Sequence, residues 1–120
     1  MQDFRKLQIW ENSHELTLEI YKVTKSFPKE ELFGLTSQIR RSTSSIPTNI
    51  SEGCVKSSQK EFSRYLYIAL GSASETEYLI LLCYELNYLT EEDYIKLLID
   101  IQKVKKMLIS LILKMKSNFE

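Results

Sequence analysis

Residues 34–53 of the chain, GLTSQIRRSTSSIPTNISEG, have the apolar spacing of a single amphipathic helix. Apolar or β-branched side chains recur three and four positions apart on one face, at Leu35, Ile39, Thr43, Ile46 and Ile50. Polar side chains recur at the same intervals on another face, at Gln38, Arg41, Ser45, Asn49 and Glu52. This polar row contains no catalytic set of residues, so its regular spacing favours a recognition or assembly surface.

Pro47 lies deep inside this predicted helix. Proline has no N–H to donate, and its ring collides with the carbonyl four residues earlier, which is that of Thr43. We therefore expect the helix to bend here around the core. The hydroxyl groups of Thr43, Ser44 and Ser45 are near enough in the sequence to bond carbonyls that the bend frees. A moving hinge is the alternative interpretation of the same proline.

The composition is that of one all-helical domain. The chain has 120 residues, which suffices for a hydrophobic core, and we expect residues 1–120 to form a single domain. Only 3 glycines and 2 prolines occur, so loops should be few and short. The apolar periodicity predicts helices over about residues 3–26, 36–53, 58–88 and 91–117. Short connections between long helices favour antiparallel neighbours, which gives an up-down-up-down four-helix bundle.

Local signals mark several helix ends. Ser58 and Glu61 have the spacing of a capping box, and Thr90 and Asp93 form a weaker version. Thr36 or a neighbour is the expected N-cap of the second helix, and Gly53 is expected to end that helix in the left-handed conformation. The run Gly71-Ser72-Ala73-Ser74 lies in the middle of the third helix, where glycine costs about 1 kcal/mol relative to alanine. We expect this cost to be offset by close packing between helices.

The charge balance restricts the possible functions. Lys and Arg number 16, as do Asp and Glu, so the net charge is zero. Residues 1–60 hold nine basic and seven acidic side chains, and residues 61–120 hold seven basic and nine acidic ones. This difference between the two halves is too small to indicate a binding function. Nucleic-acid-binding domains usually carry a basic surplus, because phosphate neutralisation drives their binding. Any basic patch on this chain must therefore be local and balanced elsewhere.

The cysteines and the apolar stretches indicate the compartment. Cys54 and Cys83 stand alone without a CxxC pair, which argues against a zinc site and favours a reducing environment. The N-terminus lacks the apolar core of a signal peptide. Charged residues interrupt the apolar stretches well before the ~20 residues that a membrane span needs. We therefore expect a soluble, cytoplasmic protein with no membrane partner.

Two predicted helices each carry two apolar stripes. In the first helix, one stripe contains Ile9, Leu16, Ile20, Val23 and Phe27, and the nearly opposite stripe contains Leu7, Trp10, His14, Leu18 and Tyr21. In the last helix, a heptad-like seam contains Tyr94, Leu97, Ile101, Val104, Leu108, Leu111 and Met115, while Ile95, Ile99, Ile109 and Leu113 lie off it. Because an isolated bundle needs one stripe per helix, the second stripe predicts a homo-oligomer. The interface candidates are Leu7, Trp10, Leu18, Tyr21, Gln38 and Asn49, with the off-seam residues of the last helix as an alternative.

A series of motifs follows in order along nearly the whole chain. They are Phe4-x-x-Leu7 with Trp10, Phe27-Pro28-x-x-Glu31, Gly34-Leu35-Thr36-x-Gln38-Ile39-Arg40-Arg41, Ser45-Ile46-Pro47-x-Asn49-Ile50-x-Glu52-Gly53, and Ile68-Ala69-x-Gly71-Ser72-x-x-Glu75. In this order they resemble the four-helix-bundle proteins named after 23S rRNA intervening sequences, whose fold is shared by the accessory proteins of diversity-generating retroelements. The resemblance implies an antiparallel four-helix bundle, ring-shaped homo-oligomers that are pentamers, and nucleic-acid binding.

Basic side chains at three places are candidates for nucleic-acid binding: Arg40, Arg41, Lys56, Lys60, Arg64, Lys103 and Lys106. The planar guanidinium of the two adjacent arginines suits a phosphate, and ion pairs with Glu75, Glu77 or Glu52 are the alternative. The candidates around the start of the third helix lie where backbone N–H groups favour an anion, with ordinary solvated side chains as the alternative. The lysines of the last helix also complement the helix dipole.

No catalytic set, cofactor site or metal site is predicted. His14 is the only histidine, so no Ser–His–acid or Cys–His set exists without it, and no Glu-x-x-His pair of a di-iron bundle occurs. We therefore expect a non-catalytic, ring-forming homo-oligomer that acts as an adaptor for RNA, DNA or a nucleic-acid-processing protein such as a reverse transcriptase. A protein-only oligomeric scaffold is the alternative.

Overall fold

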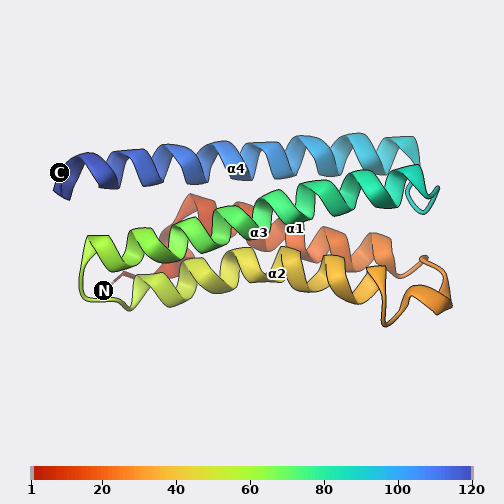
Figure 1. Cartoon of the computed structure of the whole chain (residues 1–120), viewed down its shortest axis with the longest axis horizontal. Coiled ribbons are helices and arrows are strands. Elements are labelled where there is room, and N and C mark those ends of the chain that lie inside the picture. The colour runs from red at the N-terminus through yellow and green to blue at the C-terminus, as the bar shows by residue number, and fades with distance from the viewer. Residues whose placement is uncertain (1, 120) are drawn as a thin grey trace.

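The computed structural model describes residues 2–119, with side chains described as far as Ser117. Four α-helices pack against one another: α1 (Gln8–Thr24), α2 (Leu35–Cys54), α3 (Gln59–Glu85) and α4 (Glu91–Phe119). The 3-10 helices η1 (Phe4–Lys6) and η2 (Lys29–Glu31) precede α1 and α2, and no strand occurs in this part of the chain. The all-α prediction is confirmed. Both ends of the chain lie at the same end of the molecule as the α2–α3 connection (Figure 1).

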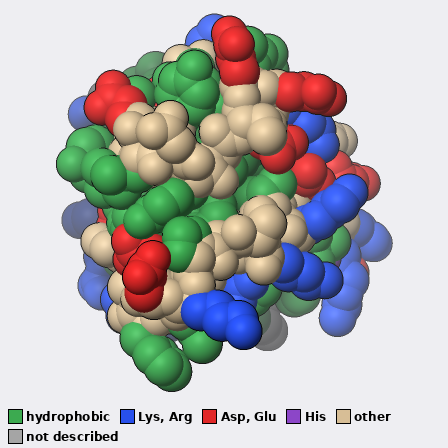
Figure 2. Space-filling view, turned by 90° about the vertical axis from the view of Figure 1, so that its right-hand side faces the viewer, with side chains coloured by type: hydrophobic (Ala, Val, Ile, Leu, Met, Phe, Trp, Pro, Cys, Tyr) green, Lys and Arg blue, Asp and Glu red, His purple; other side chains and the backbone are tan. Residues whose placement is uncertain are grey.

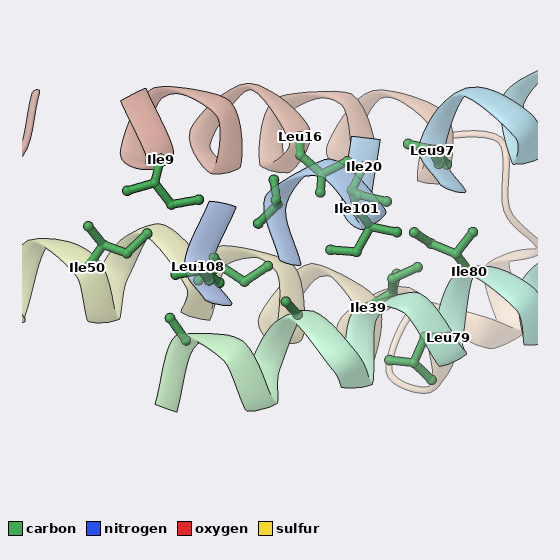
Figure 3. Packing of buried hydrophobic residues seen from close by; sticks show 14 of the residues in the cluster. Ile9, Leu16, Ile20, Ile39, Ile50, Leu79, Ile80, Leu97, Ile101 and Leu108 are labelled. Atoms are coloured by element: carbon green, nitrogen blue, oxygen red, sulfur yellow. The ribbon is translucent and has the colours of Figure 1, made fainter. Parts of the chain in front are cut away.

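The core runs along the middle of the four helices and matches the apolar periodicity of the sequence. Ile20, Ile39 and Ile101, from three helices, are fully buried and lie in the space between them (Figure 3). The predicted seam of α4 supplies the buried residues Leu97, Ile101, Val104, Leu108 and Met115. The stripe of α1 that begins at Ile9 is buried at Ile9, Leu16 and Ile20, and Phe27, which follows the helix, is buried as well. The off-seam residues of α4 are exposed, as expected for a second apolar side.

The first helix is shorter than predicted at both ends. Leu7 has an extended backbone, with φ −88° and ψ 125°, and it separates η1 from α1. The Asp3 carboxylate caps η1 by accepting a hydrogen bond from the Arg5 N–H at 3.1 Å. The helix ends at Thr24 rather than Ser26, and the chain turns before Phe27 and Pro28. The prediction of one helix over residues 3–26 is therefore wrong at its boundaries.

The two predicted caps of α2 are also wrong. The helix begins at Leu35, after Gly34, and the Glu31 carboxylate accepts from the Leu35 N–H at 3.2 Å, while Thr36 is buried. Gly53 lies inside the helix, and no described glycine has a positive φ. A Cβ at Gly53 would lie 2.7 Å from a ring carbon of Phe62 and 2.9 Å from the Cβ of Tyr65. Glycine is required here because α3 approaches closely, not because of the backbone angles.

Pro47 is buried within α2, and the helix continues through it. The Thr43 carbonyl loses its helical donor to this proline. The Thr17 hydroxyl of α1 lies 3.4 Å from this carbonyl, but its single proton also donates to the Ser13 carbonyl at 2.8 Å, so the longer contact is the weaker one. The hydroxyl groups of Thr43 and Ser44 donate to carbonyls of the preceding turn, at 2.6 Å and 3.3 Å, and not to the freed carbonyl as expected from the sequence. The bend at Pro47 stays a prediction.

The connection between α3 and α4 is tight. Asn87 has φ 65°, and the N–H groups of Asn87 and Tyr88 donate to the carbonyls of Tyr84 and Cys83, each at 2.9 Å. This is a Schellman ending with asparagine in the place usually taken by glycine, and it stops α3 at Glu85 instead of the predicted Tyr88. The predicted N-caps are confirmed, because Ser58 accepts from the Glu61 N–H and Thr90 accepts from the Asp93 N–H, both at 3.1 Å.

Helix α3 is the one described helix that is long and apolar enough to cross a membrane, with a mean hydropathy of 1.2 over its most apolar window. The expectation that every apolar stretch is too short is therefore corrected for α3. The core helix of a soluble protein passes the same test, and α3 carries a buried face that includes Leu66, Ala69 and Ala73. Its Glu77 also binds Lys105 of α4 at 2.8 Å, which fits a helix packed in a bundle.

Candidate nucleic-acid interface

The bundle is neutral as a whole, but its charges are separated along its length. One end, which we call the basic end, comprises residues 2–12, 47–66 and 108–116, with seven Lys and Arg and four Asp and Glu side chains. The opposite end comprises residues 19–40 and 78–100, with five Lys and Arg and eight Asp and Glu side chains. Figure 2 views the opposite end, where carboxylates, lysines and apolar side chains intermingle. A local basic surplus therefore exists despite a net charge of zero.

Three of the seven predicted nucleic-acid-binding residues lie together at the basic end. Lys56 is in the α2–α3 connection, and Lys60 and Arg64 follow on the first turns of α3. The Lys56 ammonium lies 5.0 Å from the centre of the Tyr65 ring, and the Arg64 guanidinium lies 5.7 Å from the same centre. Arg64 also lies 3.9 Å from the Glu61 carboxylate in an exposed ion pair. These contacts orient the cations around one tyrosine and leave them accessible.

A groove of about 530 Å³ opens beside these cations, between the start of α3 and the end of α4. Its lining residues are Ser58, Lys60, Glu61, Ser63, Arg64, Tyr67 and Lys116. The groove therefore combines three cations with one carboxylate and one aromatic ring. Its volume lies in the range of small-molecule pockets. Sequence reasoning did not select Tyr67 or Ser63, and it noted Lys116 only as one of several lysines of the last helix, without grouping it with the start of α3.

Arg40 has a structural role in α2. Its guanidinium donates to the Thr24 hydroxyl at 2.8 Å and to the Tyr21 carbonyl at 3.4 Å, and it covers the Tyr21 ring at 4.7 Å. The predicted alternative of a carboxylate partner is wrong for Arg40, because the groups within its reach belong to α1. Arg41 is exposed and lines a small polar cavity of about 190 Å³ with Glu75. The two adjacent arginines therefore point to different neighbours, away from the basic end.

Lys103 and Lys106 lie on the α4 surface, outside the basic-end groove. Lys103 lines a groove of about 490 Å³ between α1 and α4 that also holds the carboxylates of Glu15, Glu19 and Asp100. Burial raises the pKa of the Asp100 carboxyl. Lys106 lines a more apolar groove of about 460 Å³ beside Met107 and Leu111. The acidic neighbours of Lys103 make it a poor phosphate contact. Because Arg40, Arg41, Lys103 and Lys106 lie outside the basic-end groove, the seven predicted residues do not form one surface.

The predicted interface residues also divide into groups. Leu7 and Trp10 are half-buried against the core of their own chain, and Trp10 stacks on His14 with ring centres 4.7 Å apart. Leu18 is 57% exposed, whereas the Arg40 guanidinium covers Tyr21. Gln38 is exposed, but the Asn49 amide donates to the Ser45 carbonyl at 2.8 Å within α2. Leu18, Tyr21 and Gln38 are the exposed members of the six, and their role in assembly stays a prediction.

The polar row of α2 contributes to packing as well as to the surface. The Ser45 and Ser72 hydroxyl groups are 2.9 Å apart, and the Thr76 hydroxyl donates to that of Ser42 at 2.9 Å. These contacts join α2 to the small residues in the middle of α3. Ala73 is fully buried, which confirms the expected close packing there, but Gly71 faces outward with no atom within 4 Å of an ideal Cβ. The packing explanation therefore fails for Gly71 within this chain.

Comparison with known proteins places these features in a family context. Residues 5–110 match the family model of the 23S rRNA-intervening sequence proteins. The crystal structure of a protein of unknown function from the S23 ribosomal protein family of Bacteroides thetaiotaomicron is similar, with a TM-score of 0.78 and 34% sequence identity. The similarity covers 87% of this chain and 97% of that chain. No curated protein matches the sequence.

Proposed function

The chain belongs to the 23S rRNA-intervening sequence protein family, and we propose that it is a non-catalytic, ring-forming homo-oligomer that binds RNA or DNA at its basic end. The family is of unknown function, and its name connects it with ribosomal RNA. We propose that the protein acts in the cytoplasm as an adaptor, for nucleic acid alone or together with a nucleic-acid-processing protein. A relation to retroelement accessory proteins belongs to the same proposal.

The proposed assembly is supported by the apolar side chains that the bundle leaves exposed. Outward residues of α3 and α4 include Ile68, Leu81, Ile95, Ile99, Ile109 and Leu113. Monomeric proteins rarely expose extended apolar surface, because its burial is favourable. The helices are proposed to run antiparallel in up-down-up-down order, and the bundles are proposed to associate side by side in a pentameric ring. Gln38, Leu18 and Tyr21 are the candidate contacts from the sequence that are exposed.

The separation of charge is the observation that carries the nucleic-acid proposal. Lys60 and Arg64, both exposed, and Lys116 line one groove at the end with the basic surplus. If the subunits of a ring point the same way, their basic ends lie on one face, and the positive potential adds over the subunits. A neutral monomer would then present a phosphate-binding face without a basic overall composition.

The test is light scattering coupled to size exclusion, with and without a mixed pool of RNA and DNA, followed by binding measurements over a series of salt concentrations. We expect a discrete multimer near five subunits that takes up nucleic acid at low salt. The double variant Lys60→Ser with Arg64→Ser removes two groove cations. If each of these two cations neutralises one phosphate of a single strand, the negative slope of log affinity against log salt should become shallower by about 1.4 in the variant. The control Lys22→Ser with Lys25→Ser removes two exposed charges from the opposite end and should keep the wild-type slope.

The exposed apolar faces and zero net charge also support a second function, that of a protein-only scaffold. A discrete multimer that ignores nucleic acid at low salt would favour the scaffold and reject the nucleic-acid part of the proposal. A monomer would reject the ring. Equal loss of binding in the Lys60/Arg64 variant and in its Lys22/Lys25 control would show that general charge, rather than the basic end, attracts the polyanion.

A further inference from the structure

Tyr67, which lies just beyond the basic end as defined above and lines its groove, differs from Tyr65 in what covers its ring. Tyr65 is half-buried, and the cations of Lys56 and Arg64 lie over its ring, at 5.0 Å and 5.7 Å from the ring centre. Tyr67 is 52% exposed and lines the groove with Lys60 and Arg64. An aromatic side chain that is half exposed inside a cationic groove has a free surface of a kind that ordinary core packing does not require.

The lining of this groove matches the chemistry of single-stranded nucleic acid. Nonspecific single-strand sites combine cations that follow the phosphates with aromatic rings on which bases stack. Lys60, Arg64 and Tyr67 are spaced one turn apart along the same side of α3, and Lys116 is on the α4 side of the groove. The lining has one carboxylate, Glu61, which lies 3.9 Å from Arg64 in an exposed ion pair, and its three cations outnumber this one negative charge.

A duplex does not fit this arrangement as well as a single strand. In a duplex, the bases stack on one another, so only their edges and the phosphates are accessible to a protein. The Tyr67 ring could then contribute nothing beyond contact with the sugar–phosphate backbone. In a single strand, the face of a base is free to stack on the ring, whatever the base.

We propose that the basic-end groove binds single-stranded nucleic acid by stacking one base on Tyr67, with the adjoining phosphates held by Lys60, Arg64 and Lys116. This inference rests on the proposed nucleic-acid function and adds to it a choice of single strand over duplex and one residue responsible for that choice. Stacking gives little discrimination among bases, so the groove should accept RNA or DNA of many sequences.

Tyr78 provides a matched control for Tyr67. It is on the same helix, is 58% exposed and lies outside the groove lining, about 16 Å further along the helix axis. Affinities of wild type, Tyr67→Ala, Tyr67→Phe and Tyr78→Ala should be measured by fluorescence anisotropy at low salt. The probes are a labelled single-stranded oligonucleotide without self-complementarity and the same strand annealed to its complement.

We expect Tyr67→Ala to weaken single-strand binding by about 5- to 150-fold, which corresponds to the loss of one base–aromatic stack. Tyr67→Phe should stay close to wild type because it keeps the ring, and Tyr78→Ala should have no effect. Duplex affinity should be lower than single-strand affinity and unchanged by Tyr67→Ala. Circular dichroism and light scattering on each variant report whether fold and assembly are intact.

A second measurement does not depend on any variant. A single strand that carries 5-iodouridine is cross-linked to the wild-type protein by light, and the modified peptide is identified by mass spectrometry. The expected adduct lies in the peptide that contains Tyr67. Adducts confined to other peptides would overturn the inference.

The failure of this inference can be told apart from the failure of the proposed function. Equal wild-type affinity for single strand and duplex, or equal effects of Tyr67→Ala and Tyr78→Ala, would overturn the stacking site and leave nucleic-acid binding in place. If wild type binds neither probe at low salt, both the stacking site and the proposed nucleic-acid function are rejected.

Discussion

Two helical glycines form a pair whose replacement by alanine should have different effects on the free energy of unfolding, with a gain at Gly71 and no gain at Gly53. Gly53 is buried where α2 meets the start of α3, and Gly71 is exposed in the middle of α3. An ideal Cβ at Gly53 lies 2.7 Å from a ring carbon of Phe62 and 2.9 Å from the Cβ of Tyr65, whereas one at Gly71 meets nothing within 4 Å. Both residues are helical, so the change in backbone propensity is the same.

The magnitudes follow from two terms. Alanine in place of a helical glycine gains about 1 kcal/mol at both positions, because glycine loses more backbone entropy on folding. At Gly71 no steric term opposes this gain, so Gly71→Ala should stabilise the fold by about 1 kcal/mol. At Gly53 the new methyl group overlaps the buried Phe62 ring and the Tyr65 Cβ, and such overpacking costs about 1–3 kcal/mol. Gly53→Ala should therefore range from neutral to about 2 kcal/mol destabilised.

The assay is urea unfolding followed by circular dichroism, with all three proteins at the same protomer concentration. Equal concentrations are needed because assembly shifts apparent stability by mass action. Gly71→Ala should unfold at higher urea than wild type, and Gly53→Ala should unfold at lower urea than Gly71→Ala. If Gly53→Ala is stabilised as much as Gly71→Ala, the proposed close approach of α3 at Gly53 is wrong. Destabilisation by Gly71→Ala together with loss of assembly would place Gly71 in a subunit contact.

Three further predictions concern buried or paired groups. Thr17→Val should lower the free energy of unfolding by about 0.5–1.5 kcal/mol, since it removes a buried hydroxyl that donates to the Ser13 carbonyl at 2.8 Å and lies 3.4 Å from the Thr43 carbonyl; the exposed-site control Thr48→Val should be nearly neutral, and equal urea midpoints for the two would contradict this. The Lys105 ammonium donates to the Glu77 carboxylate and lowers the pKa of that carboxyl. The pair therefore stabilises the fold fully at pH values above the unfolded-state pKa of Glu, about 4.3. This stabilisation is lost as the pH falls through the lower folded-state pKa. Wild type should exceed Glu77→Gln by up to about 1 kcal/mol at neutral pH, and a difference in urea stability that persists in strong acid would refute the pairing. Burial raises the pKa of the Cys83 thiol to about 11, so iodoacetamide at mildly alkaline pH should alkylate Cys83 far more slowly in the folded protein than in urea, and equal rates would show that the thiol is accessible.

The faces of the helices could be predicted from the sequence because burial imposes a period on the chain. Ile39, Ile46 and Ile50 recur at helical spacing and are all fully buried. The caps at Ser58 and Thr90 were predictable for a related reason, since each involves a hydrogen bond between groups three residues apart. Local spacing is sufficient information for both kinds of feature.

Features that depend on contact between helices could not be predicted in this way. Nothing near Gly53 in the sequence indicates that Phe62 and Tyr65 pack against it, so the turn-ending role of glycine is the natural but incorrect expectation. Arg40 finds its partner in Thr24, 16 positions away on another helix, and no spacing rule selects a hydroxyl there over a carboxylate. No spacing rule predicts either that the Thr17 hydroxyl of α1 lies 3.4 Å from the Thr43 carbonyl, which Pro47 leaves without its helical donor.

The candidate site was predictable in part for the same reason. Lys56, Lys60 and Arg64 could be grouped because they surround one helix start. Lys116 joins them only because α4 returns along the bundle to the start of α3, and Tyr67 matters only because the groove opens beside it. Sequence spacing thus identifies the cations on one helix, whereas the combination of cations and aromatic ring requires the packed bundle.

The charge distribution shows why counting along the chain concealed the basic end. The two halves of the sequence have nearly balanced charges, nine basic and seven acidic against seven and nine. Each end of the bundle, however, draws residues from both halves: the basic end takes residues 2–12 from the first and residues 108–116 from the second. Division by position in space gives seven basic and four acidic side chains at one end and five and eight at the other. Because a polyanion responds to the local field rather than to the net charge, zero net charge is no argument against nucleic-acid binding by a bundle of this kind.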